Sequence, residues 1–143
     1  MRRGFSLLEL VIALVILGLL SSAAVPAFAG IRDRYAVQAV AAAIAGAHNR
    51  ARIRAILEGQ VTELDIRPDS LVLRVGAGAA SVPVWSAPGP LPSGVSMASP
   101  PRTLAFTPSG VTMGFANATF VVTRGGARRQ VVVSRMGRVR VIP

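Results

Sequence analysis

One carboxylate, Glu9, lies at the start of a long apolar run near the N-terminus. The 22 residues from Leu10 to Ile31 carry no charged side chain. As a helix they would extend about 33 Å, enough to cross a hydrocarbon core of about 30 Å. A carboxylate in a bilayer costs about 2.5 to 3.5 kcal/mol at the helix centre and less near an end, so it is expected to have a function and a cationic partner. The run therefore predicts a membrane helix with one acid that requires a positive charge.

The basic residues form the second chemically informative group. All 16 are arginine, whereas the six acids end at Asp69, so residues 70–143 carry eight arginines and no acid. A field of this sign attracts polyanions or anionic membrane surfaces. Arg138 and Arg140 alternate with valines, which on a strand places both arginines on one face. One interpretation is an edge strand whose charges discourage pairing with other chains.

Nothing in the sequence indicates an enzyme, a metal site or a cofactor. The chain has one histidine, His48, and no cysteine, so it offers neither a thiolate site nor a disulfide. His48 lies in a helical stretch, where we expect an exposed or boundary position rather than a ligand or base. The glycines at 76 and 78 lack the spacing of a dinucleotide or phosphate loop.

The segment after the apolar run predicts a continuation of the same helix. Val37, Val40, Ile44 and Ala47 recur at spacings of three and four, and Ile53, Ile56 and Leu57 are expected to extend this stripe. We predict one helix from Phe5 to Leu57, with Gly59 as its C-cap.

Beyond Gly59 the pattern changes to short strands. They are predicted at 61–66, 71–75, 104–106, 111–115, 119–123, 130–134 and 138–142. Turns are predicted at Pro68-Asp69, Pro108-Ser109-Gly110 and Gly125-Gly126. The Gly/Pro/Ser-rich stretch 76–101 is expected to be a mobile loop around Trp85. Strands that follow one another after a single helix predict an antiparallel α+β domain.

The N-terminal residues MRRGFSLLE resemble the type III signal of type IV pilins and type II secretion pseudopilins. The resemblance implies that a prepilin peptidase cuts between Gly4 and Phe5 and methylates the new N-terminus. Glu9 would then be the fifth residue of the mature chain and would pair with the amino group of a neighbouring subunit's Phe5 during filament assembly. Pro26 falls where helices of this family often kink, because proline removes one backbone hydrogen bond.

Two other interpretations of the N-terminus stay open. Arg2 and Arg3 followed by the apolar run fit an ordinary secretory signal with cleavage after Ala27-Phe28-Ala29, although Glu9 is then unexplained. An uncleaved single-span anchor is the other. The mature N-terminus separates them, since it is Phe5 after prepilin cleavage and Gly30 after secretory cleavage.

The stretches LAFTPSGV and RRQVVVSRMGRVRV resemble the C-terminal half of the GspH/FimT branch of pseudopilins. This implies a pilin-like α+β fold, in which one long N-terminal helix packs on an antiparallel β domain. The domains would be a leader at 1–4, a transmembrane helix half at 5–31 and a periplasmic GspH-like domain at 32–143.

The implied function is that of a minor pseudopilin of the type II secretion system. The protein would be anchored in the bacterial inner membrane by a single pass, with its C-terminal domain in the periplasm, and then incorporated into a pilus-like filament. Its partners would be other pseudopilins or minor pilins, the prepilin peptidase and the inner-membrane assembly platform.

The alternative is a FimT-like type IV minor pilin that binds DNA for natural transformation. For that side of the branch the resemblance implies DNA binding by the terminal G-R-x-R, here Arg138 and Arg140, and Arg128, Arg129 and Arg135 could extend the patch. Arginine suits phosphate because its planar group donates two parallel hydrogen bonds. A third possibility is a generic structural minor pilin.

Overall fold

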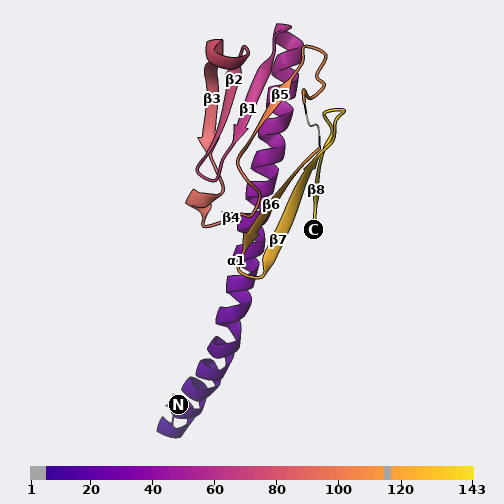
Figure 1. Cartoon of the computed structure of the whole chain (residues 1–143). Coiled ribbons are helices and arrows are strands. Elements are labelled where there is room, and N and C mark those ends of the chain that lie inside the picture. The colour runs from indigo at the N-terminus through magenta and orange to yellow at the C-terminus, as the bar shows by residue number, and fades with distance from the viewer. Residues whose placement is uncertain (1–5, 115–116) are drawn as a thin grey trace. The chain divides into compact units, whose positions relative to one another are not determined.

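The computed structural model describes residues 6–114 and 117–143, without the side chains of 23–27. The chain divides into two compact units, residues 1–32 and 33–143, which are described separately below. A single α-helix, α1, spans Leu7–Glu58 (Figure 1). Gly59 follows it with a φ of 63°, a left-handed conformation that glycine adopts without strain. The helix ends one residue beyond the predicted Leu57, and the conformation of Gly59 agrees with the predicted cap.

In the unit 33–143, one face of α1 is packed against the strands. Its buried residues are Val37, Val40, Ala41, Ile44, Ala47, His48, Ala51 and Ala55. From Ile44 onward the stripe continues in steps of four and three through His48 and Ala51 to Ala55. The expectation that Ile53, Ile56 and Leu57 extend it was wrong, because these three side chains are exposed. The alanines provide the contact instead, and their small side chains allow a close approach of the strands.

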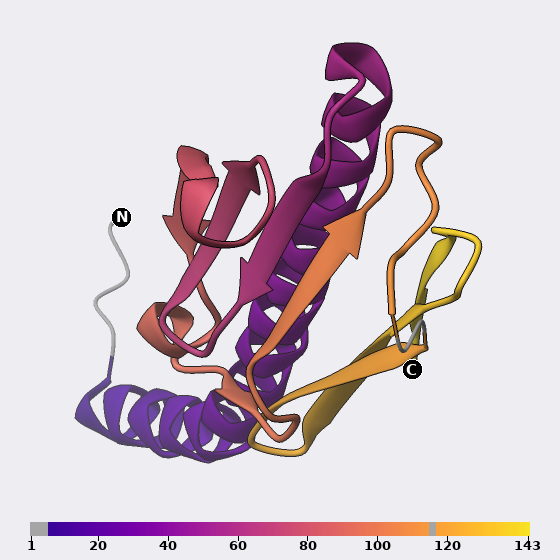
Figure 2. The ribbon, with the colours of Figure 1, turned by 45° about the horizontal axis from the view of Figure 1, so that its top comes forward.

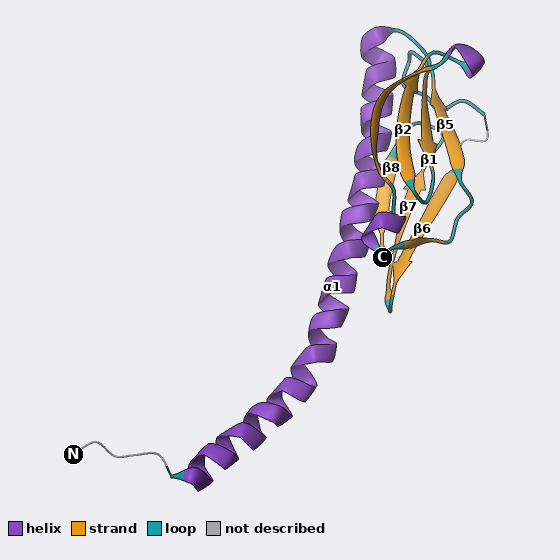
Figure 3. Ribbon diagram, turned by 90° about the vertical axis from the view of Figure 1, so that its left-hand side faces the viewer, coloured by secondary structure: helices purple, strands orange, loops and turns teal. Residues whose placement is uncertain are grey.

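The strands form two four-stranded antiparallel sheets that lie on one side of α1 (Figure 3). The first has the order β3-β2-β1-β5, with β1 at Thr62–Ile66, β2 at Ser70–Val75, β3 at Val82–Pro88 and β5 at Arg102–Phe106. The second has the order β4-β6-β7-β8, with β4 at Ser96–Met97, β6 at Ala118–Arg124, β7 at Ala127–Val133 and β8 at Val139–Ile142. These elements confirm the α+β prediction.

Both sheets contribute to one hydrophobic core against α1. Buried and more exposed residues alternate along β1, β2 and β6, the period expected of strands with one covered face. Phe106 of β5 and Phe120 of β6 are the largest fully buried side chains. The core therefore holds the two sheets and α1 together as one domain, and it positions the outer faces of the sheets.

Two strand predictions need correction. The expected loop 76–101 contains β3, two 3-10 turns (Gly78–Ala80 and Leu91–Ser93) and β4. The segment 82–88 forms a strand despite two prolines because β3 lies at a sheet edge, where a missing N–H is tolerated. The strand expected at 111–115 is reduced to a single bridge between Thr112 and Phe106, and residue 115 lies outside the described residues.

Candidate functional site

The N-terminal helix segment exposes its apolar side chains. Every Leu, Ile and Val from Leu7 to Leu20 is between 48% and 80% exposed, and Glu9 lies exposed in the first turn of α1. An apolar surface of this extent normally contacts lipid or other protein chains. Within the described part of the chain, no helix is long and apolar enough to cross a membrane. Gly4 and Phe5 lie outside the described residues, and the kink at Pro26 stays a prediction.

Three of the expected arginines share the outer face of the second sheet. β8 is the edge strand, and its register on β7 places Arg140 opposite Val132 and Ile142 opposite Gln130. Arg128 lies two residues before Gln130 on β7 and therefore points to the same face as Gln130 and Val132. Arg128, Arg138 and Arg140 are exposed, whereas Val139 and Val141 pack against the core. The predicted alternation along the edge strand is confirmed. We call Arg128, Arg138 and Arg140 the arginine face.

The structure does not bring Arg129 to the arginine face. It points to the opposite side of β7, where its Nε donates to Oε1 of Gln38 on α1 at 2.9 Å. Arg135 is exposed in the β7–β8 turn, next to the arginine face, and its carbonyl oxygen accepts a hydrogen bond from the Thr112 hydroxyl at 2.9 Å. The five candidate arginines therefore divide into three on the face, one at its end and one bound to α1.

The ion pairs of the described residues leave the arginine face without a counter-charge. Asp33 pairs with Arg124 at 2.9 Å, Glu58 with Arg54 at 2.7 Å and Asp65 with Arg74 at 3.4 Å. None of these pairs involves the arginine face. Its positive potential is therefore available to a partner.

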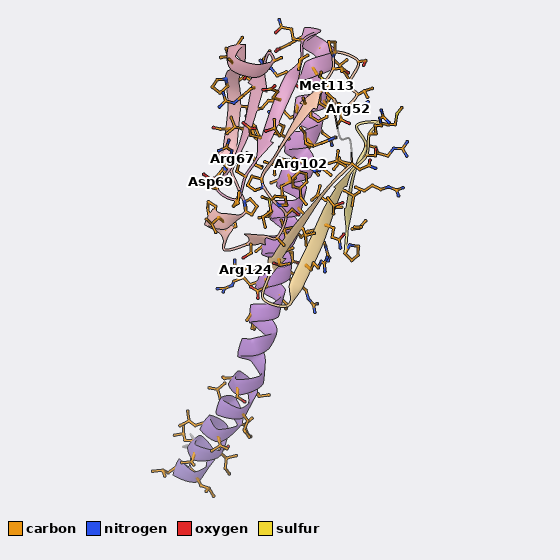
Figure 4. All side chains as sticks on the ribbon, in the orientation of Figure 1. Arg52, Arg67, Asp69, Arg102, Met113 and Arg124 are labelled. Atoms are coloured by element: carbon orange, nitrogen blue, oxygen red, sulfur yellow. The ribbon has the colours of Figure 1, made fainter. Side chains whose placement is uncertain are left out.

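Arg124 is a structural residue that the sequence did not reveal. Besides its pair with Asp33 of α1, it donates through Nη1 to the carbonyl oxygen of Ser93 at 2.6 Å. It thus joins the β6–β7 hairpin, α1 and the 3-10 turn before β4 (Figure 4). Its partners are 91 and 31 positions away, so no local pattern could have indicated the contact.

His48 is fully buried, and the expectation of an exposed or boundary position was wrong. Its ring meets Phe106 edge-on, with centroids 5.0 Å apart, and neither ring nitrogen has a hydrogen-bond partner. Burial lowers the pKa of His48; the neighbouring Asn49 side chain opposes part of this shift, and the positive charge of Arg52 adds to it. The signal was present in the sequence, since His48 lies four residues after Ile44 and three before Ala51. The residue is part of the buried core between α1 and β5.

Two hollows mark the surface of the domain at 33–143. One hollow of about 570 Å³ follows the exposed side of α1 and is lined by Gly46, Asn49, Arg50, Ile53, Arg54, Leu57 and Glu58. A polar hollow of about 240 Å³ lies where Arg67, Asp69 and Arg102 meet (Figure 4).

Trp85 of β3 is covered by Arg50, whose guanidinium carbon lies 5.0 Å from the ring centroid. Among the described residues, no three His, Cys, Asp or Glu side chains form a metal-binding group.

Comparisons with known proteins agree with this architecture. Residues 1–25 match the prokaryotic N-terminal methylation motif, and residues 40–137 match the family "Type II transport protein GspH". The pilin-like protein PilA1 of Thermus thermophilus is 31% identical over 156 aligned residues, which cover 97% of each chain.

The fold is similar to that of the type IV minor pilin FimU of Pseudomonas aeruginosa. One crystal form has a TM-score of 0.63 at 20% identity, covering 77% of this chain and 90% of FimU. A second crystal form has a TM-score of 0.58 at 19% identity, covering 74% and 92%. At this identity the likeness shows the pilin-like fold alone. Taken with the two family matches, it leads to one conclusion: the chain belongs to the GspH family of pilin-like proteins, with a prepilin-type methylation motif ahead of a pilin-like domain.

Proposed function

We propose that this protein is a minor pseudopilin of the type II secretion system. It is stored in the inner membrane through residues 5–31, with its C-terminal domain in the periplasm. Prepilin peptidase cleaves it between Gly4 and Phe5 and methylates the new N-terminus. It then joins a filament with other pseudopilins through the membrane assembly platform, and it acts by protein contacts rather than by catalysis.

The observation that carries this proposal is an apolar helix surface that no other described residue of its own unit covers. Its side chains are at least about half exposed, and one acid interrupts them near the N-terminus. A carboxylate in hydrocarbon is stabilised when an opposite charge neutralises it. The amino group of Phe5 on an adjacent subunit is such a charge once the leader has been removed.

The first test is the mature N-terminus. Mass spectrometry of the protein recovered from its own cells should find a chain that begins with N-methylated Phe5. A chain that begins at Gly30, or that keeps Met1, contradicts the proposal.

The second test separates assembly from processing. Glu9→Val makes the span more apolar, so membrane insertion and cleavage should persist while incorporation into filaments falls. Leu10→Val, a change of similar size at the adjacent position, is the control and should assemble normally. Normal incorporation of Glu9→Val would show that the charge pairing is not required.

A second candidate function, DNA capture by a FimT-like minor pilin, is favoured by the arginine face. Arg128 and Arg140 share one side of the sheet, and by strand geometry their backbones are roughly 14 Å apart. No acid of the described ion pairs reaches them. Such a face fits phosphate groups, because phosphate contacts require only charge and position.

Electrophoretic retardation of duplex DNA by residues 32–143 separates the two candidates. If DNA is the partner, Arg138→Ala/Arg140→Ala should weaken binding and reduce the slope of log K against log salt by about 2. The control Arg34→Ala/Arg67→Ala removes the same charge from exposed positions outside the arginine face and should retain most of the affinity. Absence of retardation at low salt eliminates DNA capture. Equal losses in both double variants would indicate binding through net charge alone.

Deletion of the gene distinguishes a role in the secretion system from a role in DNA uptake. Deletion of a secretion pseudopilin should reduce export of secreted proteins, whereas deletion of a DNA-uptake pilin should reduce transformation. A generic structural minor pilin predicts neither defect.

A further inference from the structure

Three segments meet at the end of the domain where α1 terminates. Nε of Arg52 donates to the carbonyl oxygen of Gly110 at 3.0 Å, and the Thr112 hydroxyl donates to the carbonyl oxygen of Arg135 at 2.9 Å. The β5–β6 loop therefore bridges α1 and the β7–β8 turn (Figure 2). A Cβ added to Gly137 would lie 2.6 Å from the Gly110 oxygen, which shows how closely the two loops approach.

Apolar side chains project from this junction into solvent. Ile56 of α1 is 46% exposed, Met113 of the β5–β6 loop 51% and Met136 of the β7–β8 turn 72%. We call these three residues, with Arg135 and Arg138, the end face. Figure 4 labels Met113 and Arg52 at this end of the domain. Methionine is common at surfaces that accommodate a protein partner, because its flexible, polarisable side chain adapts to the opposing shape.

The end face is preorganised for binding. Thr112, next to Met113, is buried and bonded to the backbone of Arg135, the residue before Met136. The two methionines are thus attached to anchored backbone. A surface that is already ordered loses less conformational entropy when a partner binds.

The charge of the end face is entirely positive. Arg135 and Arg138 are exposed there, and the β5–β6 loop and the β7–β8 turn contain no acid. Glu58, at the end of α1, is held by Arg54 at 2.7 Å. A complementary partner must therefore combine apolar side chains with carboxylates.

A second copy of this chain is poorly suited to be this partner, because it is strongly basic. It has six acids in 143 residues, none of them after Asp69, and a net charge of +10. Asp33, Glu58 and Asp65 are already paired with arginines of their own chain. Two copies would bring like charges together, which opposes association.

We propose that the end face docks an acidic, apolar-centred surface of a different subunit of the filament. This deepens the proposed function, on which it rests, by assigning a partner chemistry. It also implies that the subunit has a heteromeric position, next to an acidic neighbour rather than within a run of identical copies. A nucleic acid would use the arginines but not Ile56, Met113 and Met136, so the apolar residues favour a protein.

The chain contains no cysteine, which allows a site-specific test with the full-length protein in detergent. Met136→Cys is labelled with an environment-sensitive fluorophore, and Leu91→Cys, which is exposed in the second 3-10 turn, is the control. The probe is a 20-residue amphipathic peptide with glutamates on one helical face and leucines on the other. A scrambled peptide of the same composition and a 20-base-pair DNA duplex are the comparisons.

The amphipathic peptide should produce a saturable signal at position 136 and none at position 91. Met113→Ser and Arg135→Ala/Arg138→Ala, each in the labelled protein, should weaken binding at least tenfold, whereas Arg67→Ala should leave it unchanged. An equal response to the scrambled peptide, or no saturable response, overturns the proposal. So does tighter binding of DNA that Met113→Ser does not affect, which would assign the end face to nucleic acid.

The experiment distinguishes failure of the docking surface from failure of the proposed function. Peptide binding does not require leader cleavage or Glu9, so a mature N-terminus at Phe5 without peptide binding removes only the docking surface. An N-terminus at Gly30 with intact peptide binding removes the pseudopilin assignment and leaves the end face as a protein-binding surface.

Discussion

Arg124 connects parts of the domain that are remote in sequence, and its removal should be costly. It and Asp33 are only 23% and 20% exposed, at 2.9 Å, so Arg124→Ala leaves a largely buried carboxylate unpaired. We expect a loss of about 1–3 kcal/mol in the free energy of unfolding. Arg54→Ala is the matched control, because Arg54 and Glu58 are 40% and 36% exposed, and it should cost less than about 1 kcal/mol. Urea unfolding of both variants measures the difference, and equal losses would contradict the role of Arg124.

His48 should make the domain less stable in mild acid. Burial lowers its pKa below 6.5 in the folded state, so as the pH falls through 6.5 the unfolded chain takes up a proton that the folded chain does not. Stability then decreases by at most about 1.4 kcal/mol per pH unit, until the pH reaches the folded-state pKa. Urea unfolding at pH 8 and pH 5 should show the loss in the natural chain. In His48→Leu, which has no imidazole, most of this difference should disappear. If both proteins lose the same stability, another group is responsible.

Among the elements, those with a clear period were predictable and those defined by long-range contacts were not. The helix and strands such as β1 and β7 follow from apolar spacing in the sequence, and the turn at Gly125-Gly126 from its glycines. The sequence did not predict β3 because its composition is typical of a loop. The segment is held in a strand conformation by its pairing with β2. His48 was misplaced because the stripe was continued toward the larger side chains Ile53 and Leu57 rather than toward Ala51. The division of the strands into two sheets depends on pairing that no local signal encodes.

The β7–β8 turn provides an element-scale prediction. Gly137 has a φ of 70°, and an added Cβ would meet the Gly110 oxygen at 2.6 Å and the Arg52 side chain at about 3 Å. Gly137→Ala should therefore destabilise the domain by more than about 1 kcal/mol. Gly126→Ala is the control, since a Cβ there meets nothing within 4 Å, and it should change stability by less than about 0.5 kcal/mol. Thermal unfolding of the two variants tests this prediction. Similar midpoint temperatures would show that the β7–β8 turn does not dock on the β5–β6 loop.

At the scale of the whole molecule, the N-terminal helix favours association with other molecules, whereas the net charge of the domain opposes association of identical copies. The exposed apolar helix near the N-terminus favours association with lipid or other chains. The domain at 33–143 instead carries thirteen arginines against five acids, a net charge of +8, which keeps identical domains apart. Neighbours in the proposed filament would therefore have to carry domains that are less basic or acidic, which agrees with the charge argument made for the end face.

This balance predicts how residues 33–143 behave alone in solution. At 0.01 M salt the screening length is about 30 Å, so identical domains should repel one another, and small-angle scattering at increasing protein concentration should show reduced intensity at low angle. At 1 M salt the length falls to about 3 Å and the repulsion should vanish. Arg128→Glu/Arg140→Glu lowers the net charge by four and should weaken the low-salt repulsion, whereas Arg128→Lys/Arg140→Lys keeps the charge and should preserve it. A dimer or larger oligomer of the natural domain at low salt would show that specific contacts overcome the charge, and the case for a different neighbour at the end face would lose its electrostatic basis.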